Sequence, residues 1–306
     1  MKKLLAILLA LACVFALAAC TATPAKVDTN DTPDTTSTPD ITDDADATED
    51  ADAANITSST SEFADLTILD IPLTDEEYAI GFRVGSDLTP AVNAAIVELQ
   101  SNGTLSALAE KYEVSDLLIT ETFMPDLDAT TSVADFEAVT AAGTLVIGIT
   151  EYKPMNYYDA SGTLVGFDTE FAEAVCEILG ITPEFIVINW DTKEIELAGG
   201  QIDCIWNGLT VTEPRRENMD FSLSYLRNEQ VIVVKNDVAD QYPDVASLAG
   251  LTVVAEEGSA GESAALEIDG IDYIAVALQS AALLEVKAGT ADAAIIDVTT
   301  AMAMTK

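Results

Sequence analysis

The chain has 306 residues, with 13 basic and 53 acidic side chains and a formal net charge of −40. This balance excludes nucleic-acid binding, because a phosphate backbone requires a basic protein surface. The sequence contains no histidine, so Ser-His and Cys-His nucleophile pairs and the usual zinc sites are excluded as well. Catalysis is therefore not the first hypothesis.

The first residues are typical of an export signal. The chain opens with Met-Lys-Lys, continues with an apolar run over residues 4–16 and reaches Leu17-Ala-Ala-Cys20. The run is too short to span a membrane as a helix, which predicts a signal peptide over residues 1–19. The last four residues resemble a bacterial lipobox, which implies lipidation of Cys20 and anchoring to the outer face of the cell membrane. A plain signal peptide with an incidental cysteine is the alternative.

Residues 20–61 consist mainly of Thr, Asp, Ala, Pro and Ser, and Lys26 is their one basic residue. Such a segment cannot bury enough apolar surface to offset the entropy of ordering it, so a disordered tether is predicted. Residues 62–306 remain. They are enough for one large domain or two lobes.

Residues 76–87, EEYAIGFRVGSD, alternate in hydrophobicity and then reach a glycine turn. They predict a strand that leads into a helix, and a second helix follows the break at Asn102-Gly103, with Thr104 as its expected cap. The apolar positions expected to face the core are Leu88, Val92, Ile96 and Leu99 in the first helix and Leu105, Leu108 and Tyr112 in the second. This unit is typical of the end of a domain, although it stands near the beginning of the chain.

Strands and helices alternate from residue 144 onward, which predicts a doubly wound α/β architecture with a parallel sheet. Strands are expected over residues 144–149, 183–189, 202–206, 231–234, 251–255, 273–276 and 293–296. Helices are expected over residues 168–179, 193–198 and 298–306. Two more are expected: one that begins at residue 260, and one that follows the strand over 273–276 and includes residue 284. Cys176 falls on a predicted helix and Cys204 on a predicted strand, so a disulfide and two buried free thiols both remain open.

Two stretches carry a resemblance to a known family: GTLVIGITEYKPMNYYDASGTLVGFDTEFAEAVCEILGI and NWDTKEIELAGGQIDCIWNGLTVTEPRRENMDFSLSYL. They resemble the extracytoplasmic solute-binding proteins of polar amino acid ABC importers (family 3 type), over residues 135–297. The resemblance implies a two-lobed type II periplasmic-binding-protein fold with mainly parallel sheets and two crossing strands, which closes on its ligand. It also implies a monomer that captures a free amino acid for a permease and ATPase complex, without a cofactor.

The order of the predicted elements differs from the order in that family. Family members continue past the position of Thr299 with a second crossing and two closing helices, and residues 64–112 resemble this last part. We therefore expect a circular permutation, in which residues 113–133 join the usual termini. Lobe 2 would comprise residues 62–75 and 226–306, and lobe 1 residues 76–225, with crossings near 71–75 and 226–230. The alternative is the tail of one gene copy fused to the head of another.

An amino acid presents a carboxylate and an ammonium group, so its binding site needs a cation or helix N-terminus and an acid. Thr210 and Arg215 surround a predicted helix start, where a guanidinium can bind a carboxylate in a bidentate fork. The resemblance implies that Arg215 binds the ligand carboxylate, with Thr210 beside it and the carbonyl of Gly208 facing the ammonium. A surface ion pair with a nearby glutamate is the alternative, and it suits Arg216 better.

The second lobe offers a helix start and an acid. Ser259-Ala-Gly-Glu262 has capping-box spacing, and its helix N-terminus can add N–H groups to the same carboxylate, so Ser259 and Ala260 are expected to contact the ligand. A cap without a ligand is the alternative. Asp297 ends a predicted strand at the carboxyl edge, where open α/β sheets bind ligands. The resemblance implies that it binds the ammonium, and a solvated strand-end aspartate is the alternative.

Aromatic residues are expected to form the walls of the site. Tyr152 and Trp190 match family positions that hold the ligand side chain, and Trp206 is expected on the pocket floor, with core packing as the alternative for each. Glu151 is a further candidate for contact with a polar or cationic side chain. A dehydratase-like enzyme on the same fold remains an alternative function, for which Glu151 is the one candidate acid or base, and a ligand-sensing domain is another.

Overall fold

The computed structural model describes residues 61–121 and 131–306. The predicted signal peptide, Cys20 and nearly all of the tether lie outside the described residues, as does part of the predicted junction, 122–130. Among the residues that the structure describes, no helix combines the length and the apolar character needed to cross a membrane.

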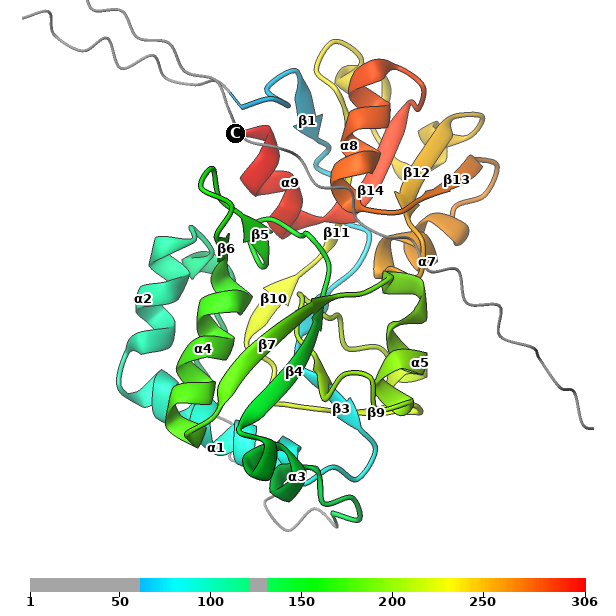
Figure 1. Ribbon diagram of the computed structural model, residues 1–306. Helices are drawn as coiled ribbons and strands as arrows, with labels where there is room; N and C mark the ends of the chain where they lie inside the picture. The colour runs from blue at the N-terminus through cyan, green and yellow to red at the C-terminus, as the bar shows by residue number, and fades with distance from the viewer. Residues whose placement is uncertain (1–60, 122–130) are drawn as a thin grey trace, which may run out of the picture. The chain divides into compact units, whose positions relative to one another are not determined.

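Lobe 1 is built around a five-stranded sheet with the order β7-β4-β8-β3-β9 (Figure 1). Its strands are β3 (Gly81–Arg83), β4 (Thr144–Ile149), β7 (Thr182–Val187), β8 (Cys204–Ile205) and β9 (Met219–Phe221). Its helices are α1 (Leu88–Ser101), α2 (Thr104–Lys111), α3 (Asp135–Ala142), α4 (Phe167–Leu179), α5 (Lys193–Ala198) and α6 (Glu213–Arg216). The apolar faces of α1 and α4 pack together in one core with Phe82, Leu145 and Ile147 of the sheet, as amphipathic helices beside a sheet do.

Lobe 2 is built around a second five-stranded sheet, with the order β1-β11-β14-β12-β13. Its strands are β1 (Leu66–Ile68), β11 (Gln230–Lys235), β12 (Thr252–Glu256), β13 (Asp272–Val276) and β14 (Ala293–Asp297), and its helices are α7 (Ala260–Leu266), α8 (Gln279–Ala288) and α9 (Val298–Thr305). Val231 and Val233 pack in one core and Ile232 and Val234 in another. The continuous apolar run of β11 thus arises because both faces of the sheet are covered.

Short elements complete the described fold. The strands β5 (Tyr157–Tyr158) and β6 (Leu164–Val165) form a small antiparallel pair that leads into α4. Short 3₁₀ helices lie at Ser115–Leu117, Trp190–Thr192, Ala239–Gln241 and Val245–Leu248.

The expectation of mainly parallel sheets is wrong in part. In each five-stranded sheet, two strand pairings are parallel and two are antiparallel. The antiparallel pairings all involve β3 or β11, the strands that directly follow the crossings between the lobes. The parallel pairings belong to the β4 and β12 regions, where helices carry the chain from strand to strand, as parallel pairing requires.

Two strands carry the chain between the lobes. β2 (Glu76–Tyr78) and β10 (Leu226–Asn228) pair antiparallel, with Glu76 opposite Asn228 and Tyr78 opposite Leu226. β2 follows β1 of lobe 2 and leads to β3 of lobe 1, whereas β10 follows β9 of lobe 1 and leads to β11 of lobe 2. Figure 1 shows β10 between the two sheets. The fold therefore has two α/β lobes and two crossings, as predicted, although the first crossing strand lies at residues 76–78 and not at 71–75.

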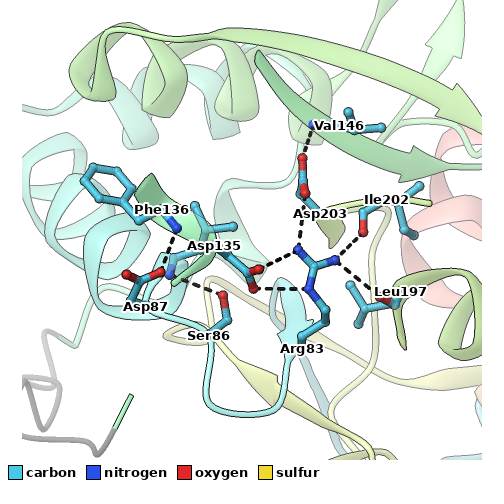
Figure 2. A network of polar contacts seen from close by, with 10 residues as sticks. Arg83, Ser86, Asp87, Asp135, Phe136, Val146, Leu197, Ile202 and Asp203 are labelled. Carbon is cyan, nitrogen blue, oxygen red and sulfur yellow. Dashed lines mark hydrogen bonds and ion pairs between the residues drawn. The ribbon is translucent and has the colours of Figure 1, made fainter. Parts of the chain in front are cut away.

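Arg83 fixes the early part of the chain to later elements of lobe 1 (Figure 2). Its guanidinium donates to Asp135 at 3.1 Å and to Asp203 at 3.2 Å. It also donates to the carbonyl oxygens of Ile202 at 2.7 Å and Leu197 at 3.3 Å. Planar guanidinium groups bind carboxylates with defined geometry, so residues 81–83 are held in the sheet that residue 144 begins.

Two local expectations are wrong. Gly103, and not Thr104, precedes α2 as its cap, and the N–H of Thr104 instead donates to Asn102 at 2.9 Å. The helical spacing of residues 168–179 predicts Ile178 on one face with Phe171 and Val175. Ile178 is instead 37% exposed, because the buried face of α4 runs through Ala172 and Cys176 and turns away from it. Cys176 is buried and free, as is Cys204, so the structure shows the free-thiol alternative.

Candidate functional site

A narrow cavity lies where loops of lobe 1 meet the carboxyl ends of β12 and β14 in lobe 2. It is lined by Thr150, Tyr152, Trp190, Asn207, Gly208, Thr210, Arg215, Glu256, Ser259, Ala260, Gln279 and Asp297. This lining contains every ligand-binding residue predicted from the sequence except Trp206. Residues from both lobes line the cavity, at the sheet edge where open α/β sheets bind ligands.

Arg215 is a buried cation of lobe 1 in this cavity. Thr212 caps the short helix α6 by accepting the N–H of Arg215 at 3.3 Å, which fixes the start of the helix. Arg215 is only 7% exposed. Its guanidinium donates to the carbonyl of Thr210 at 2.7 Å and to the carbonyl of Gly258 in lobe 2 at 3.1 Å. Arg216 is exposed and pairs with Glu213 at 3.8 Å. The surface ion pair thus belongs to Arg216.

Lys193 is a second buried cation, which the sequence analysis missed. Its Nζ donates to the carbonyl of Trp190 at 3.0 Å and to that of Gly258 at 2.9 Å, and it lies 4.7 Å from the centroid of the Trp190 ring. Burial, and then the charge of Arg215, lower the pKa of Lys193 to about 7. The sequence placed this lysine only at the start of a predicted helix, and nothing in the helical pattern distinguishes it from a solvated one.

Asp297 is the buried acid of lobe 2. Its carboxylate accepts hydrogen bonds from Asn228 at 2.5 Å, from Gln230 at 2.7 Å and from the side chain of Gln279. Its own N–H donates to Gln279 at 3.0 Å. Burial, and then the charge of Glu76, raise the pKa of Asp297. The solvated alternative is therefore wrong, because amide donors hold this carboxylate inside the protein.

Glu76 of the crossing strand β2 joins this network. Its Oε2 accepts from Asn228 at 2.9 Å, from Gln230 at 3.0 Å and from the hydroxyl of Thr210 at 3.1 Å. The same two amide groups thus bridge the carboxylates of Glu76 and Asp297. Glu76, Asn228 and Gln230 were not predicted as site residues, because their contact depends on the pairing of β2 with β10.

Three hydroxyl groups meet across the lobes beside the cavity. The hydroxyl of Tyr152 lies 2.6 Å from that of Tyr78 and 2.6 Å from that of Thr299, and Tyr78 and Thr299 lie 3.2 Å apart. Tyr152 and Tyr78 belong to lobe 1 and its crossing, whereas Thr299 belongs to α9 of lobe 2. Tyr152 therefore lines the cavity with its ring and connects the lobes with its hydroxyl.

The loop at Gly208 depends on a close approach to Tyr152. Gly208 has φ +55°, and a Cβ atom there would lie 2.4 Å from Cε1 of Tyr152. Its N–H donates to Asp168 at 2.6 Å, and Asp168 also accepts from Tyr225 at 2.9 Å. Burial raises the pKa of Asp168 to about 7, although both hydrogen bonds lower it. Asp168, in the first turn of α4, thus positions the Gly208 loop.

Ser259 caps α7 as predicted, since its hydroxyl accepts the N–H of Glu262 at 3.0 Å. The reciprocal contact differs from the expected capping box, because Glu262 accepts from Gly258 at 2.7 Å and not from Ser259. Gly258 thereby has its N–H bound within lobe 2 and its carbonyl bound by lobe 1. Ser259 and Ala260 both line the cavity.

Trp206 does not lie where it was predicted. Its side chain is fully buried in the core of lobe 1, where its ring meets Phe171 edge-on with a centroid distance of 5.0 Å. This is the core-packing alternative, since a residue that directly follows a short buried strand can point to either face of the sheet. Trp190, by contrast, lines the cavity. Glu151 is exposed.

A larger cavity of about 290 Å³ lies near the ends of α2 and α9. Its charged lining residues include Lys111, Lys153 and Lys306, which are all exposed. Exposed charges are solvated and contribute little to binding. The narrower cavity remains the candidate site, because it places a buried cation from one lobe and a buried acid from the other around one space.

Comparisons with known proteins identify the family. Residues 145–286 match the bacterial extracellular solute-binding proteins, family 3. The chain is 30% identical over 152 residues to the lysine/arginine/ornithine-binding periplasmic protein of Escherichia coli, a match that covers 48% of this chain and 58% of that protein. It is 31% identical over 150 residues to the histidine-binding periplasmic protein of Salmonella typhimurium, covering 48% and 57%. The match thus spans less than two thirds of each curated relative.

Solved structures extend this similarity to the fold. The arginine-bound form of truncated ArgBP from T. maritima matches with a TM-score of 0.53 and 32% identity, over 55% of this chain and 79% of that one. The ancestral amino acid-binding protein AncCDT-1, a precursor of cyclohexadienyl dehydratase, matches with a TM-score of 0.52 and 32% identity, over 54% and 74%. The two-lobed fold, the order of the motifs and these matches agree. The chain belongs to the bacterial extracellular solute-binding proteins, family 3.

Proposed function

We propose that this protein captures a free amino acid between its two lobes, outside the cytoplasm, and delivers it to the permease and ATPase of an ABC importer. The observation that carries the proposal is the placement of Arg215 and Asp297, a buried cation and a buried acid from different lobes, around one cavity. Arg215 would bind the ligand carboxylate and Asp297 the ammonium. The relatives named as amino acid-binding proteins, and the similar ABC uptake transporter substrate-binding protein from Streptococcus pneumoniae, support it.

Ligand binding is expected to close the two lobes, because the groups that bind the two charges of the ligand belong to different lobes. A ligand shifts a protein toward a closed state only by binding that state more tightly than the open one. Arg215 with Thr210 belongs to lobe 1, whereas Asp297 with Ser259 belongs to lobe 2. An amino acid therefore meets both of its charge partners only when the lobes come together, and no cofactor is required.

A thermal-shift screen of the purified protein against the amino acids tests this proposal, since a ligand at about 100 times its Kd adds about 2.7 kcal/mol of stability. Arg215→Ala is expected to abolish the ligand-induced shift without loss of the fold. Arg216→Ala, in the same helix but exposed, is the matched control and is expected to bind normally. Undiminished binding by Arg215→Ala in calorimetry would contradict the assignment.

The location proposed for the protein is the outer face of the cell membrane, through a lipid on Cys20. The Leu-Ala-Ala-Cys sequence after an apolar run supports it. Cys20→Ser is expected to shift the protein from the membrane fraction to the soluble fraction. Equal membrane association of both forms would argue against the lipid anchor.

We also propose that the chain is a circular permutation of the family fold. Two observations support it: residues 64–109 contribute to both sheets, and the Ser61 hydroxyl contacts the carbonyl of Met304. A reordered chain, in which residues 134–306 precede residues 62–112, is expected to fold and bind the same ligand. A reordered chain that folds but shows no binding would favour the fused-gene alternative.

An enzyme on the same fold is a second candidate, because one similar structure is described as the precursor of a dehydratase. Such an enzyme needs a general acid or base in the cavity, and Glu151, the candidate from the sequence, is exposed. Chromatography of each bound amino acid after incubation with the protein separates the two functions. Recovery of unchanged ligand supports binding, whereas a product supports the enzyme.

A further inference from the structure

Glu256 is a buried acid in the cavity for which neither sequence nor comparison gave a role. It is the last residue of β12, it is 5% exposed, and it lines the same cavity as Arg215 and Asp297. Its Oε1 atom has no hydrogen-bond partner within the described residues. Because an unpaired buried acceptor destabilises the fold, this atom is a candidate for contact with a ligand.

The nearby cations do not neutralise Glu256 by direct pairing. Lys193 and Arg215 both direct hydrogen bonds to the carbonyl of Gly258, and neither forms an ion pair with Glu256 across residues 61–121 and 131–306. Burial and the charge of Asp297 both disfavour the ionised form of Glu256, and they raise its pKa to about 8. A positive group placed beside it would relieve both effects.

Glu256 also lies where the cavity continues. A second recess shares Thr150, Tyr152, Glu256 and Gln279 with the first and extends toward Glu151, Met304 and the exposed Lys153. This recess adjoins the space between Arg215 and Asp297, so it can receive the side chain of a ligand bound there. Glu256 stands on the wall between the two spaces.

The contacts of the carboxyl groups favour a cationic side chain over a neutral one. Glu76, Glu256 and Asp297 lie around the cavity, whereas Arg215 and Lys193 donate to carbonyl oxygens and not to these carboxyl groups. A positive ligand group beside Glu256 would favour its ionised form, and buried charges are tolerated when they are paired.

We propose that Glu256 binds the side chain of the ligand and selects amino acids whose side chain carries a positive charge. The inference rests on the proposed capture of an amino acid. It makes Glu256 the residue that determines specificity, while Arg215 and Asp297 recognise groups that all amino acids share.

Matched ligand pairs test the proposal by isothermal titration calorimetry on the unmodified protein. L-arginine is compared with its neutral isostere L-citrulline, and L-lysine with L-norleucine. At least one cationic member is expected to bind about 10- to 100-fold more tightly than its neutral counterpart, the range for a hydrogen-bonded charged group. This comparison needs no variant, so it holds even where a substitution impairs folding.

Glu256→Gln keeps the shape of the side chain and removes its charge, and it is expected to abolish the preference. Glu257→Gln, which removes a charge from the adjacent exposed residue, is the control and is expected to keep it. Equal binding of both members of each pair, or equal weakening of all ligands by Glu256→Gln, would overturn the role of Glu256. Failure of every amino acid to bind would overturn the capture function itself, so the two failures are distinguishable.

Discussion

Lys193 and Arg215 donate hydrogen bonds to one and the same atom, the carbonyl oxygen of Gly258, at 2.9 and 3.1 Å. Both cations belong to lobe 1, whereas the carbonyl belongs to the loop that precedes α7 in lobe 2. Two like charges thus converge on one acceptor, and this proximity contributes to the low pKa of Lys193. The contact joins the lobes at the rim of the cavity.

Lys193→Met is expected to weaken amino acid binding about tenfold, because the closed arrangement loses a hydrogen bond from a charged donor, which contributes about 1.5 to 3 kcal/mol. Calorimetric titration of the ligand measures the change. Lys235→Met, at the opposite end of β11 from Gln230, serves as the control and is expected to bind as the unmodified protein does. Unchanged affinity in Lys193→Met would show that the contact does not favour closure.

Gly208→Ala is expected to destabilise the protein by about 1 to 3 kcal/mol and to weaken ligand binding, because a non-glycine residue at this φ is strained and its Cβ would collide with Tyr152. Denaturant unfolding and calorimetry measure the two effects. Gly200→Ala is the matched control, because Gly200 has φ +70° with open space around it. Equal affinities in the two variants would mean that the contact with Tyr152 has no part in binding.

Asp168→Asn is expected to stabilise the protein in a pH-dependent way. The folded-state pKa of Asp168 is raised to about 7, above its unfolded value, so ionisation costs stability that grows as the pH rises from about 4 to 7. The variant should therefore match the unmodified protein near pH 4 and exceed its Tm at pH 8. Asparagine also keeps an acceptor for the N–H of Gly208.

Asp159→Asn provides the control of opposite sign. Hydrogen bonds from Ser161 and Thr163 lower the pKa of Asp159, so its contribution is present above the unfolded pKa and is lost as the pH falls. That variant should lose stability at pH 8 and not at low pH. If Asp168→Asn has a lower Tm than the unmodified protein at pH 8, ionised Asp168 stabilises the fold and the prediction is wrong.

Binding of a cationic amino acid near pH 7 is expected to release protons. The pKa of Glu256 is about 8 without ligand; burial and Asp297 raise it, whereas Lys193, Gln279 and Arg215 lower it. A positive ligand group favours the ionised form and so displaces the proton. Titrations in buffers of different ionisation enthalpy measure the release, and Glu256→Gln should abolish it. The same release in that variant would assign the proton to another group.

The elements that the sequence predicted well are those with long, regular patterns. The apolar run of β4 and the helical spacing of Leu88, Val92 and Ile96 each indicate a buried element by the local sequence pattern. Arg215 was predicted from its motif, and Asp297 from its position at the end of a strand. That both are buried in one cavity could be seen only in the folded structure.

The residues that the sequence analysis missed are those whose roles depend on long-range pairing. Glu76 and Asn228 are 152 positions apart and meet only because β2 and β10 pair. The sequence around Lys193 does not predict its burial, since a lysine in a helix is ordinarily solvated. Trp206 was misplaced for the related reason that an apolar strand does not reveal which face meets the cavity and which the core.

The short strand β1 has a protective effect on the sheet of lobe 2. It pairs along β11 from Leu66 opposite Lys235 to Ile68 opposite Val233, and so covers the outer edge of a strand with the sequence QVIVVK. An uncovered apolar edge strand is a template for pairing with further chains. A form of the protein that begins after β1 is therefore expected to aggregate edge to edge, although its cavity residues would all be retained.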